Sequence, residues 1–383
     1  MIMMKQLSCL MIAAIALFSC SGRRTAPMAD APTDTIAFKY ARLIHVEQHD
    51  GYRLVTIDHP WKPGKVLHRY HLVPYDATMS HHTEQGTTLV RVPLQKSIIF
   101  TSVHAALVAQ LHAEAQVAGV ADLKYIKVPF VQEGCRDGRL VDCGDGMNPL
   151  VEKIIDTQAD AILLSPFENS GGYGRIEDVN IPLIECAEYM ESSPLARAEW
   201  MRFYGMLYGR EREADSLFAV VDSSYNALCQ QAKKAGRGRS VLVDKQTGSV
   251  WYVPGGRSTI GQMLVDAGAD YPFAGDDHSG SLSLPFEVVL EKAGESDVWL
   301  FRYDASDTIT LDRLLSEQPG YRQLRPVRER MIYACNVTTS MFYEETPFRP
   351  DLLLQDFISI IHPHLPDMPP LNYYHQVAGT SPK

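Results

Sequence analysis

Hydrophobic and polar positions between residues 38 and 93 fall into short runs bounded by turn residues, which predicts β-strands. Ala41–Val46 and Tyr52–Ile57 flank an Asp-Gly dipeptide, which is typical of a hairpin turn because glycine accepts a positive φ. This segment is therefore predicted to be a β-rich N-terminal extension. Two further strands are expected in it, at Lys65–Val73 and Thr87–Val92.

Beyond residue 96, short apolar runs alternate with amphipathic stretches, a pattern that is typical of α/β units. Ser97–Phe100 is predicted to be a strand, His104–Gln116 a helix and Val117–Val120 the next strand. Pro149 begins another helix, and the buried strand Ala161–Ser165 follows it. The alternation returns after residue 238, with strands expected at Ser240–Asp244, Asp297–Phe301 and Met331–Ala334, and helices beginning at Ser258, Leu284 and Pro350.

A strongly helical segment separates these two halves. Ser193 can cap its start and Pro194 suits its first turn. The helix pauses at Gly209 and resumes from Arg210 to about Lys234 with one apolar stripe. About 24 residues at roughly 1.5 Å each span some 36 Å, so this helix can act as a stiff strut. The stripe consists of Ala214, Leu217, Phe218, Val221, Tyr225 and Leu228.

The amino terminus is predicted to be an export signal. Lys5 supplies its positive charge and Leu7–Phe18 its apolar run, which at roughly a dozen residues is shorter than a transmembrane helix needs. The tetrapeptide that ends at Cys20 resembles a bacterial lipobox, which implies that this cysteine is acylated and anchors the protein to a membrane. A plain secretory signal with an incidental cysteine is the alternative. Residues 21–35 lack periodicity and are expected to form a flexible tether.

Composition narrows the classes of function. Among 383 residues, 46 acidic against 36 basic side chains give a net charge of −10, which argues against a protein that binds nucleic acid through its phosphates. Cys135 and Cys143 flank a loop rich in glycine and aspartate, where a short disulfide could form in an oxidising compartment. Their spacing fits no zinc-binding pattern.

The two halves share a local plan. In each, a proline precedes a glutamate in the first turn of a helix, Glu152 or Glu287, and an aspartate then leads a strand. Proline and glutamate are favoured at helix starts in any protein, so the plan alone indicates no function.

Residues 144–163 nevertheless resemble the N-lobe signature of periplasmic binding proteins for iron-siderophores, haem and cobalamin, and residues 286–300 are similar to the matching C-lobe piece. The resemblance covers roughly residues 96–362. It implies an α/β fold of two Rossmann-like lobes joined by a long rigid interlobe helix, here with the β-rich N-terminal extension. The corresponding segments are a signal peptide (1–20), a tether (21–35), an N-terminal lobe (36–192, with the extension at 36–95), the interlobe helix (193–235) and a C-terminal lobe (236–383).

The resemblance also implies a function. By this resemblance the protein would be a substrate-binding lipoprotein of an ABC importer, located in the periplasm and lipid-anchored to a bacterial membrane. It would capture a ferric siderophore, cobalamin or haem and deliver it to the permease dimer. In that family one glutamate on each lobe meets an arginine pocket of the permease, and the matching positions are Glu152 and Glu287. Exposed charges of this kind fix orientation and docking rate more than affinity.

The cleft between the lobes is where the resemblance places the iron or cobalt chelate. Aromatic side chains near expected strand ends offer flat faces, and an arginine offers charge to carboxylate or catecholate groups. A tyrosine or histidine could also ligate the metal directly, although each of these side chains could equally belong to the core. The candidate ligand-binding residues are Trp251, Tyr252, Arg257, Phe167, Tyr173, Ser102 and His104.

Two other classes of protein remain open. His68, His71, His81 and His82 support a zinc- or manganese-binding receptor, although histidines three residues apart on a strand point to opposite faces. A surface-anchored enzyme is the third alternative, but the sequence has no G-x-S-x-G elbow, no H-E-x-x-H helix and no phosphate-binding loop. We therefore expect neither enzymatic activity, nor a resident cofactor, nor a dedicated metal site.

Overall fold

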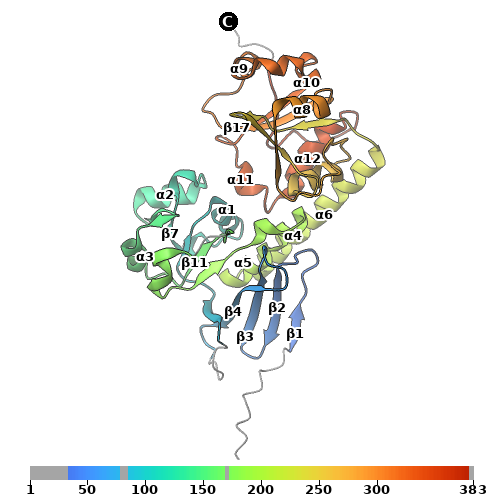
Figure 1. Cartoon of the computed structure of the whole chain (residues 1–383). Coiled ribbons are helices and arrows are strands. Elements are labelled where there is room, and N and C mark those ends of the chain that lie inside the picture. The colour runs from blue at the N-terminus through green and yellow to red at the C-terminus, as the bar shows by residue number, and fades with distance from the viewer. Residues whose placement is uncertain (1–32, 78–84, 169–171, 379–383) are drawn as a thin grey trace, which may run out of the picture.

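The fold has an N-terminal sheet, two α/β lobes and a set of helices that joins them (Figure 1). The computed structural model describes residues 33–77, 85–168 and 172–378. Each lobe is built on a parallel sheet, which confirms the expected α/β architecture. The signal peptide, Cys20 and most of the tether lie outside the described residues.

The N-terminal sheet has the order β1-β2-β3-β4-β5 and contains the four predicted strands as β2 to β5. β1 is not among the predicted strands, and it takes in the last two residues of the predicted tether (21–35). The hairpin between β2 and β3 is confirmed, and Gly51 in its turn has a φ of 79°. β5 pairs in parallel with β4, whereas the other neighbours are antiparallel. The strands are β1 (Asp34–Ile36), β2 (Ile44–His49), β3 (Tyr52–Asp58), β4 (Val66–Pro74) and β5 (Thr87–Val92).

The N-terminal lobe has a parallel sheet of order β12-β11-β6-β7-β8. Its central strands are completely buried, as the apolar runs of the sequence require. The strands are β6 (Ser97–Ile99), β7 (Val117–Val120), β8 (Val141–Asp142), β11 (Ala161–Leu164) and β12 (Leu183–Glu185), and the helices are α1 (Ser102–Gln110), α2 (Pro129–Asp137) and α3 (Val151–Thr157).

Two helix boundaries in this lobe differ from the prediction. α1 ends at Gln110, because His112 adopts a left-handed φ of 55° that a helix cannot accommodate. Pro149 does not begin a helix: it belongs to the short strand β10 (Asn148–Pro149), which pairs with β9 (Gly144–Asp145). The following helix therefore begins at Val151.

The C-terminal lobe has the sheet order β13-β17-β18-β19, of which only β19 is antiparallel, and a smaller sheet β14-β15-β16. Its strands are β13 (Val241–Val243), β14 (Gln246–Thr247), β15 (Val250–Pro254), β16 (Ser281–Leu284), β17 (Val298–Tyr303), β18 (Ile332–Asn336) and β19 (His375–Gln376). Its helices are α7 (Thr259–Asp266), α8 (Phe286–Ala293), α9 (Leu311–Glu317), α10 (Arg325–Arg328), α11 (Phe342–Glu345) and α12 (Pro350–Ile361).

The joining segment is three helices rather than one strut. α4 (Pro194–Glu199) and α5 (Met201–Tyr208) precede α6 (Glu211–Ala235), which has 25 residues and runs on into the C-terminal lobe (Figure 1). The chain reverses at Gly209, whose φ is 64°. α5 packs closely on α6, since a Cβ added at Gly205 would lie 2.7 Å from the Cβ of Ala214. Among the described residues no helix, α6 included, is long and apolar enough to cross a membrane.

Two buried glutamates fasten the N-terminal extension to these helices. The Glu199 carboxylate accepts hydrogen bonds from the backbone N–H groups of Lys39, Tyr40 and Ala41 at 2.7–2.9 Å. Glu191 accepts from the next two N–H groups of the chain, at 2.9 and 3.0 Å, and from the indole N–H of Trp200. Five backbone donors that precede β2 are thereby satisfied by two carboxylates, one on α4 and one just before α4.

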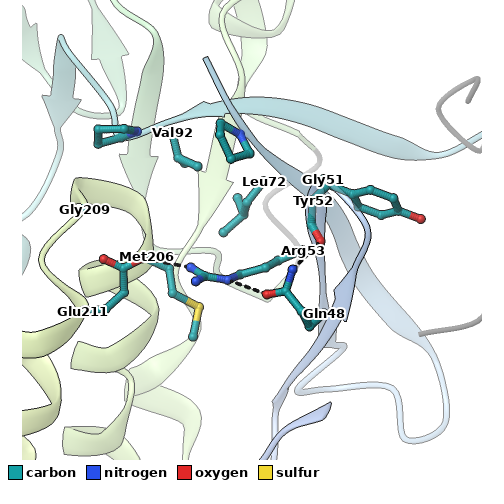
Figure 2. Close-up of a pocket in the computed structure, with 11 residues that line it drawn as sticks. Gln48, Gly51, Tyr52, Arg53, Leu72, Val92, Met206, Gly209 and Glu211 are labelled. Carbon is teal, nitrogen blue, oxygen red and sulfur yellow. Dashed lines mark hydrogen bonds and ion pairs between the residues drawn. The ribbon is translucent and has the colours of Figure 1, made fainter. Parts of the chain in front are cut away.

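A third attachment spans the opposite side of the sheet (Figure 2). Arg53 on β3 donates to Glu211 at the start of α6 at 2.9 Å and to Gln48 on β2 at 3.1 Å. The ion pair borders a cavity of about 270 Å³ between the sheet and α5, with Leu72 and Met206 among its apolar walls. Polar contacts thus join the residues before β2 to α4, and β3 to α6.

The disulfide that the spacing of Cys135 and Cys143 allowed is not formed. Cys135 on α2 and Cys143 after β8 are both free thiols. Cys143 is buried against β7, where a Cβ added at Gly119 would lie 3.1 Å from its sulfur. Burial raises the pKa of Cys143 to about 12, so this side chain acts as a small apolar group.

Glu199→Ala should lower the free energy of unfolding by about 3 kcal/mol, because it leaves three partly or fully buried N–H groups without an acceptor. Urea unfolding followed by tryptophan fluorescence measures this change. The matched control is Asp215→Ala, which removes an exposed carboxylate paired with Arg202 and should change stability by less than about 1 kcal/mol. Equal losses in the two variants would contradict the assignment.

Candidate functional site

The carboxyl ends of the parallel strands in each lobe face the other lobe. α1 begins directly after β6 in the N-terminal lobe and packs against α11, which follows β18 in the C-terminal lobe. Lys127, from the N-terminal lobe, donates to the carbonyl of Val337 at the end of β18. In α/β sheets ligands bind outside the carboxyl ends of the strands, so the interlobe region is the candidate site.

A cavity of about 320 Å³ opens at the carboxyl ends of β13, β17 and β18. Asp244, Asp304 and Val337 follow directly after these three strands and line it. Tyr252 and Tyr343 are 45% and 48% exposed and add aromatic surface from β15 and α11. The cavity therefore combines carboxylates at the strand ends with two accessible aromatic rings.

Arg302 is the fixed cation of this cavity. Its guanidinium makes a bidentate pair with Asp244, at 2.7 and 3.1 Å, and lies 5.7 and 5.9 Å from the rings of Phe342 and Tyr343. Burial acts to lower the pKa of Arg302, but the charge of Asp244 and its hydrogen bonds raise it above the ordinary value. The pair thus holds one wall of the cavity in place and connects β17 to α11.

A second cavity of about 210 Å³ lies deeper between the lobes and shares Arg302 and Tyr343 with the first. Val103 of α1 and Arg197 of α4 line its N-terminal side, and Thr259 of α7 lies on the C-terminal side. Arg302 and Tyr343 line both cavities, so the two cavities adjoin each other in the interlobe region.

Two side chains carry buried polar atoms without a hydrogen-bond partner: Arg197, which lines the deeper cavity, and His104, which follows the lining residue Val103 on α1. The Nε of Arg197 has no hydrogen-bond partner, and burial lowers the pKa of this side chain although Glu188 opposes the shift. His104 is fully buried, packs on the ring of Tyr204 and lies 3.5 Å from Glu188, yet neither ring nitrogen makes a hydrogen bond. Such atoms are costly to bury, so a water or a polar ligand group is expected to complete their hydrogen bonds.

Only Tyr252 among the predicted ligand-binding residues lines these cavities. Trp251 precedes it on β15 and points to the opposite face, as strand geometry requires. Its indole N–H donates to the carbonyl of Val243, and its fully buried ring packs with Trp299 and Tyr321. The prediction that Trp251 binds ligand is therefore corrected: this residue belongs to the core of the C-terminal lobe.

The other candidates lie around the site or away from it. His104 is buried beneath the deeper cavity rather than exposed in it. Ser102 is half-buried at the start of α1, and Phe167 and Arg257 are exposed beyond the ends of β11 and β15 without lining either cavity. The prediction that Tyr173 binds the interlobe ligand is corrected, because its hydroxyl donates to Glu185 in a separate groove.

Sequence reasoning missed Arg302, Tyr343, Lys245 and Asp304. Asp244 and Asp304 could have been predicted from the sequence, since side chains directly after parallel strands lie at the binding edge of the sheet. Tyr343 carried none, because its place depends on how α11 packs against α1.

Glu152 and Glu287 are both exposed in the first turns of α3 and α8. α3 precedes the parallel strand β11, and α8 precedes the parallel strand β17. A helix that leads into a parallel strand runs antiparallel to that strand, so each of these helices begins at the carboxyl edge of its sheet. Glu152 lies 3.5 Å from the exposed Arg175, a contact that leaves it accessible. The docking role of these two residues stays a prediction.

The histidines of the N-terminal sheet do not assemble a metal site. His68 bonds to Glu185 and Thr88, whereas the buried His71 packs near Tyr52. Within the described ranges no group of three or more His, Cys, Asp or Glu side chains could hold a metal ion. His81 and His82 lie outside the described residues.

Comparison with known proteins now adds to this geometry. The chain matches the family model of the periplasmic binding proteins over residues 99–337, more than half of its length. An uncharacterized lipoprotein of Methanocaldococcus jannaschii is 25% identical over 285 residues, which cover 72% of this chain and 67% of the relative. The N-terminal sheet, β1 to β5, precedes the matched range.

Solved structures share the fold at low sequence identity. A periplasmic haem-binding protein from Pseudomonas aeruginosa superposes with a TM-score of 0.56 at 14% identity, covering 75% of this chain and all of that one. An Fe3+-hydroxamate transport protein from Saccharomonospora viridis gives 0.53 at 21% identity, covering 70% and 93% of the two chains.

The family and these relatives are substrate-binding proteins and not enzymes, which agrees with the expectation for this chain and removes the enzyme alternative. The resemblance inferred from residues 144–163 and 286–300 is confirmed by the match and by the shared fold. The chain belongs to the periplasmic binding protein family, and it shares its fold with the haem-binding and Fe3+-hydroxamate transport proteins compared above.

Proposed function

We propose that the protein is the lipid-anchored receptor of an ABC importer, and that it captures a metal chelate between its lobes and passes it unchanged to the permease. The observation that carries this proposal is the cavity at the carboxyl edge of the C-terminal lobe's parallel sheet, which Tyr252, Tyr343 and the Arg302–Asp244 pair line. Two accessible aromatic rings suit a ligand with a flat or ring-bearing surface. Lys245 and Arg302 supply positive charge for its acidic groups.

A ferric siderophore or haem fits this cavity better than a bare metal ion. A bare zinc or manganese ion needs several converging His, Asp, Glu or Cys ligands, and the described residues assemble no such group. A chelate brings its own metal ligands and leaves only shape and charge for the protein to recognise. Cobalamin is also a metal chelate, and its visible absorbance distinguishes it from haem and from a ferric siderophore.

The location follows from the family, whose members work outside the cytoplasm. Acylation at Cys20 is the finer proposal. It is supported by the lipobox-like tetrapeptide and by the lipoprotein name of the archaeal relative. Residues 21–32 then provide the tether between the membrane and β1.

The cargo is tested by the visible absorbance of the protein purified from its native host. A haem spectrum, the charge-transfer band of a ferric siderophore or the spectrum of a corrinoid would each support the proposal and name the ligand. A colourless preparation that contains stoichiometric zinc would reject it in favour of the metal-ion receptor.

Tyr252→Ala should weaken binding of that chelate about tenfold, because an exposed ring that contacts the ligand is lost. The free energy of unfolding of this Tyr252→Ala variant should hardly change. Trp251→Ala should instead lower the free energy of unfolding by about 3–5 kcal/mol. Tyr75→Ala, which removes another half-exposed tyrosine away from both cavities, is the control and should leave affinity unchanged. Calorimetric titration and urea unfolding of all three variants measure these effects.

Permease docking is tested by the double variant Glu152→Ala and Glu287→Ala. Uptake into cells should fall about tenfold or more while chelate affinity stays the same, because exposed charges orient docking without touching the cleft. The matched control is Asp156→Ala with Glu291→Ala, which removes exposed acids one turn further along the same two helices. Normal uptake by the first double variant would reject the docking assignment.

A further inference from the structure

A groove of about 450 Å³ lies where the N-terminal sheet meets the edge strand β12 of the N-terminal lobe. None of the residues that line it lines the two interlobe cavities. Its sheet side lies before the range that matches the family model. The polar side chains that line it are His68 and Thr88 from the sheet, and Tyr173, Glu177, Asn180 and Glu185 from the lobe.

The groove is a built site rather than a loose gap. Tyr70 on β4 donates its hydroxyl to the carbonyl of Leu183 and accepts from the backbone N–H of Glu185, at 3.0 and 2.9 Å. These bonds clamp the sheet onto the backbone of β12. Glu185, only 9% exposed, is thereby held between His68 and Tyr173.

The hydrogen bonds of Glu185 fix the proton positions of its neighbours. Its Oε1 accepts from the hydroxyl of Tyr173 at 2.7 Å, and its Oε2 lies 3.0 Å from Nδ1 of His68. Since an ionised carboxylate only accepts, Nδ1 of the histidine carries the hydrogen. In the neutral ring Nε2 is then an acceptor, so the Thr88 hydroxyl, 2.7 Å away, donates to it.

Tyr173 keeps its proton in this arrangement. Burial, and then the hydrogen bond and charge of Glu185, raise the pKa of Tyr173 above its ordinary value. Its backbone N–H donates to Glu177. The donors of Tyr173, His68 and Thr88 are therefore all committed inside the cluster.

The groove thus presents lone pairs and negative charge. The oxygens of Thr88, Tyr173, Glu185 and Glu177 can still accept hydrogen bonds, and only Asn180, exposed at the rim, adds amide donors. No lysine or arginine is among the described residues that line the groove. Ile181, Pro182 and Leu183 form an apolar wall beside these acceptors.

We propose that this groove is a second binding site, and that it takes a small aliphatic cation, a protonated primary amine. An ammonium group carries three donors and no acceptor, which matches the acceptors of Glu185, Glu177 and Thr88. Its methylene chain would lie on the apolar wall of Ile181 to Leu183. This chemistry is opposite to that of the interlobe cavity, where Arg302 and Lys245 face the ligand.

A metal ion is the competing occupant of the groove. His68 and Glu185 could act as ligands, but the described residues provide no third His, Cys, Asp or Glu at a suitable distance. The amine therefore accounts better for the donors and acceptors observed.

Calorimetric titration of the full chain with 1,4-diaminobutane tests the proposal, with butyrate and 1-butanol as the matched anion and neutral compound. We expect saturable 1:1 binding of the diamine alone, weakened by added salt. Absence of saturable binding, or equal binding of butyrate, would overturn the proposal. The proposal would also be overturned if Zn2+ saturated the site in place of the diamine and the Glu185→Gln variant no longer bound Zn2+.

Variants locate the binding. Glu185→Gln should weaken diamine binding about tenfold or more, since a charge-assisted hydrogen bond is lost. Glu177→Gln, at the exposed rim, should weaken it up to about fivefold and is not expected to disturb folding. Asp178→Asn removes the adjacent exposed acid, which does not line the groove, and should leave affinity unchanged. Equal effects of Glu177→Gln and Asp178→Asn would show diffuse charge attraction and overturn the site.

Discussion

The direction of the strands in the two parallel sheets is the constraint on which the site depends. Both sheets turn their carboxyl ends toward the gap between the lobes, and the packing of α1 on α11 holds them there. Residues that follow the strands, such as Asp244 and Asp304, are consequently delivered to one place from distant parts of the sequence. The Arg302–Asp244 pair then fixes the aromatic wall against which a ligand can lie.

The N-terminal sheet shows how an addition becomes part of a fold: its buried residues Val55, Ile57 and Val90 belong to the same hydrophobic core as the joining helices. Polar contacts add to this packing: Glu199 and Glu191 accept hydrogen bonds from five backbone N–H groups, and Tyr70 bonds to the carbonyl of Leu183 and the N–H of Glu185 on the edge strand β12. An exposed edge of a parallel sheet invites pairing with other chains, so covering β12 also protects the N-terminal lobe. The same clamp creates the groove around Glu185.

The two candidate binding regions differ in charge because different elements supply them. In the interlobe region the guanidinium of Arg302 is held by Asp244 at a strand end, and the ammonium of Lys245 is held by Glu317. In the groove every polar hydrogen of the His68, Thr88 and Tyr173 side chains is directed inward to the cluster. Among the described residues of these two regions, the interlobe cavity alone therefore has lysine or arginine in its lining, and Arg302 and Lys245 are each paired with a carboxylate.

The sequence by itself determined the elements and their order. Apolar runs and caps located the central strands and most helices, although short strands such as β1, β10 and β16 were missed. The paired pieces at 144–163 and 286–300 indicated the family, because these signals are local. It could not separate Trp251 from Tyr252, since neighbouring residues on a strand differ only in which face the tertiary packing buries. Nor could it place Arg302 beside Tyr343, or His68 beside Glu185, 117 residues apart. Such pairs arise only when the lobes and the added sheet pack together, and no local pattern records that packing.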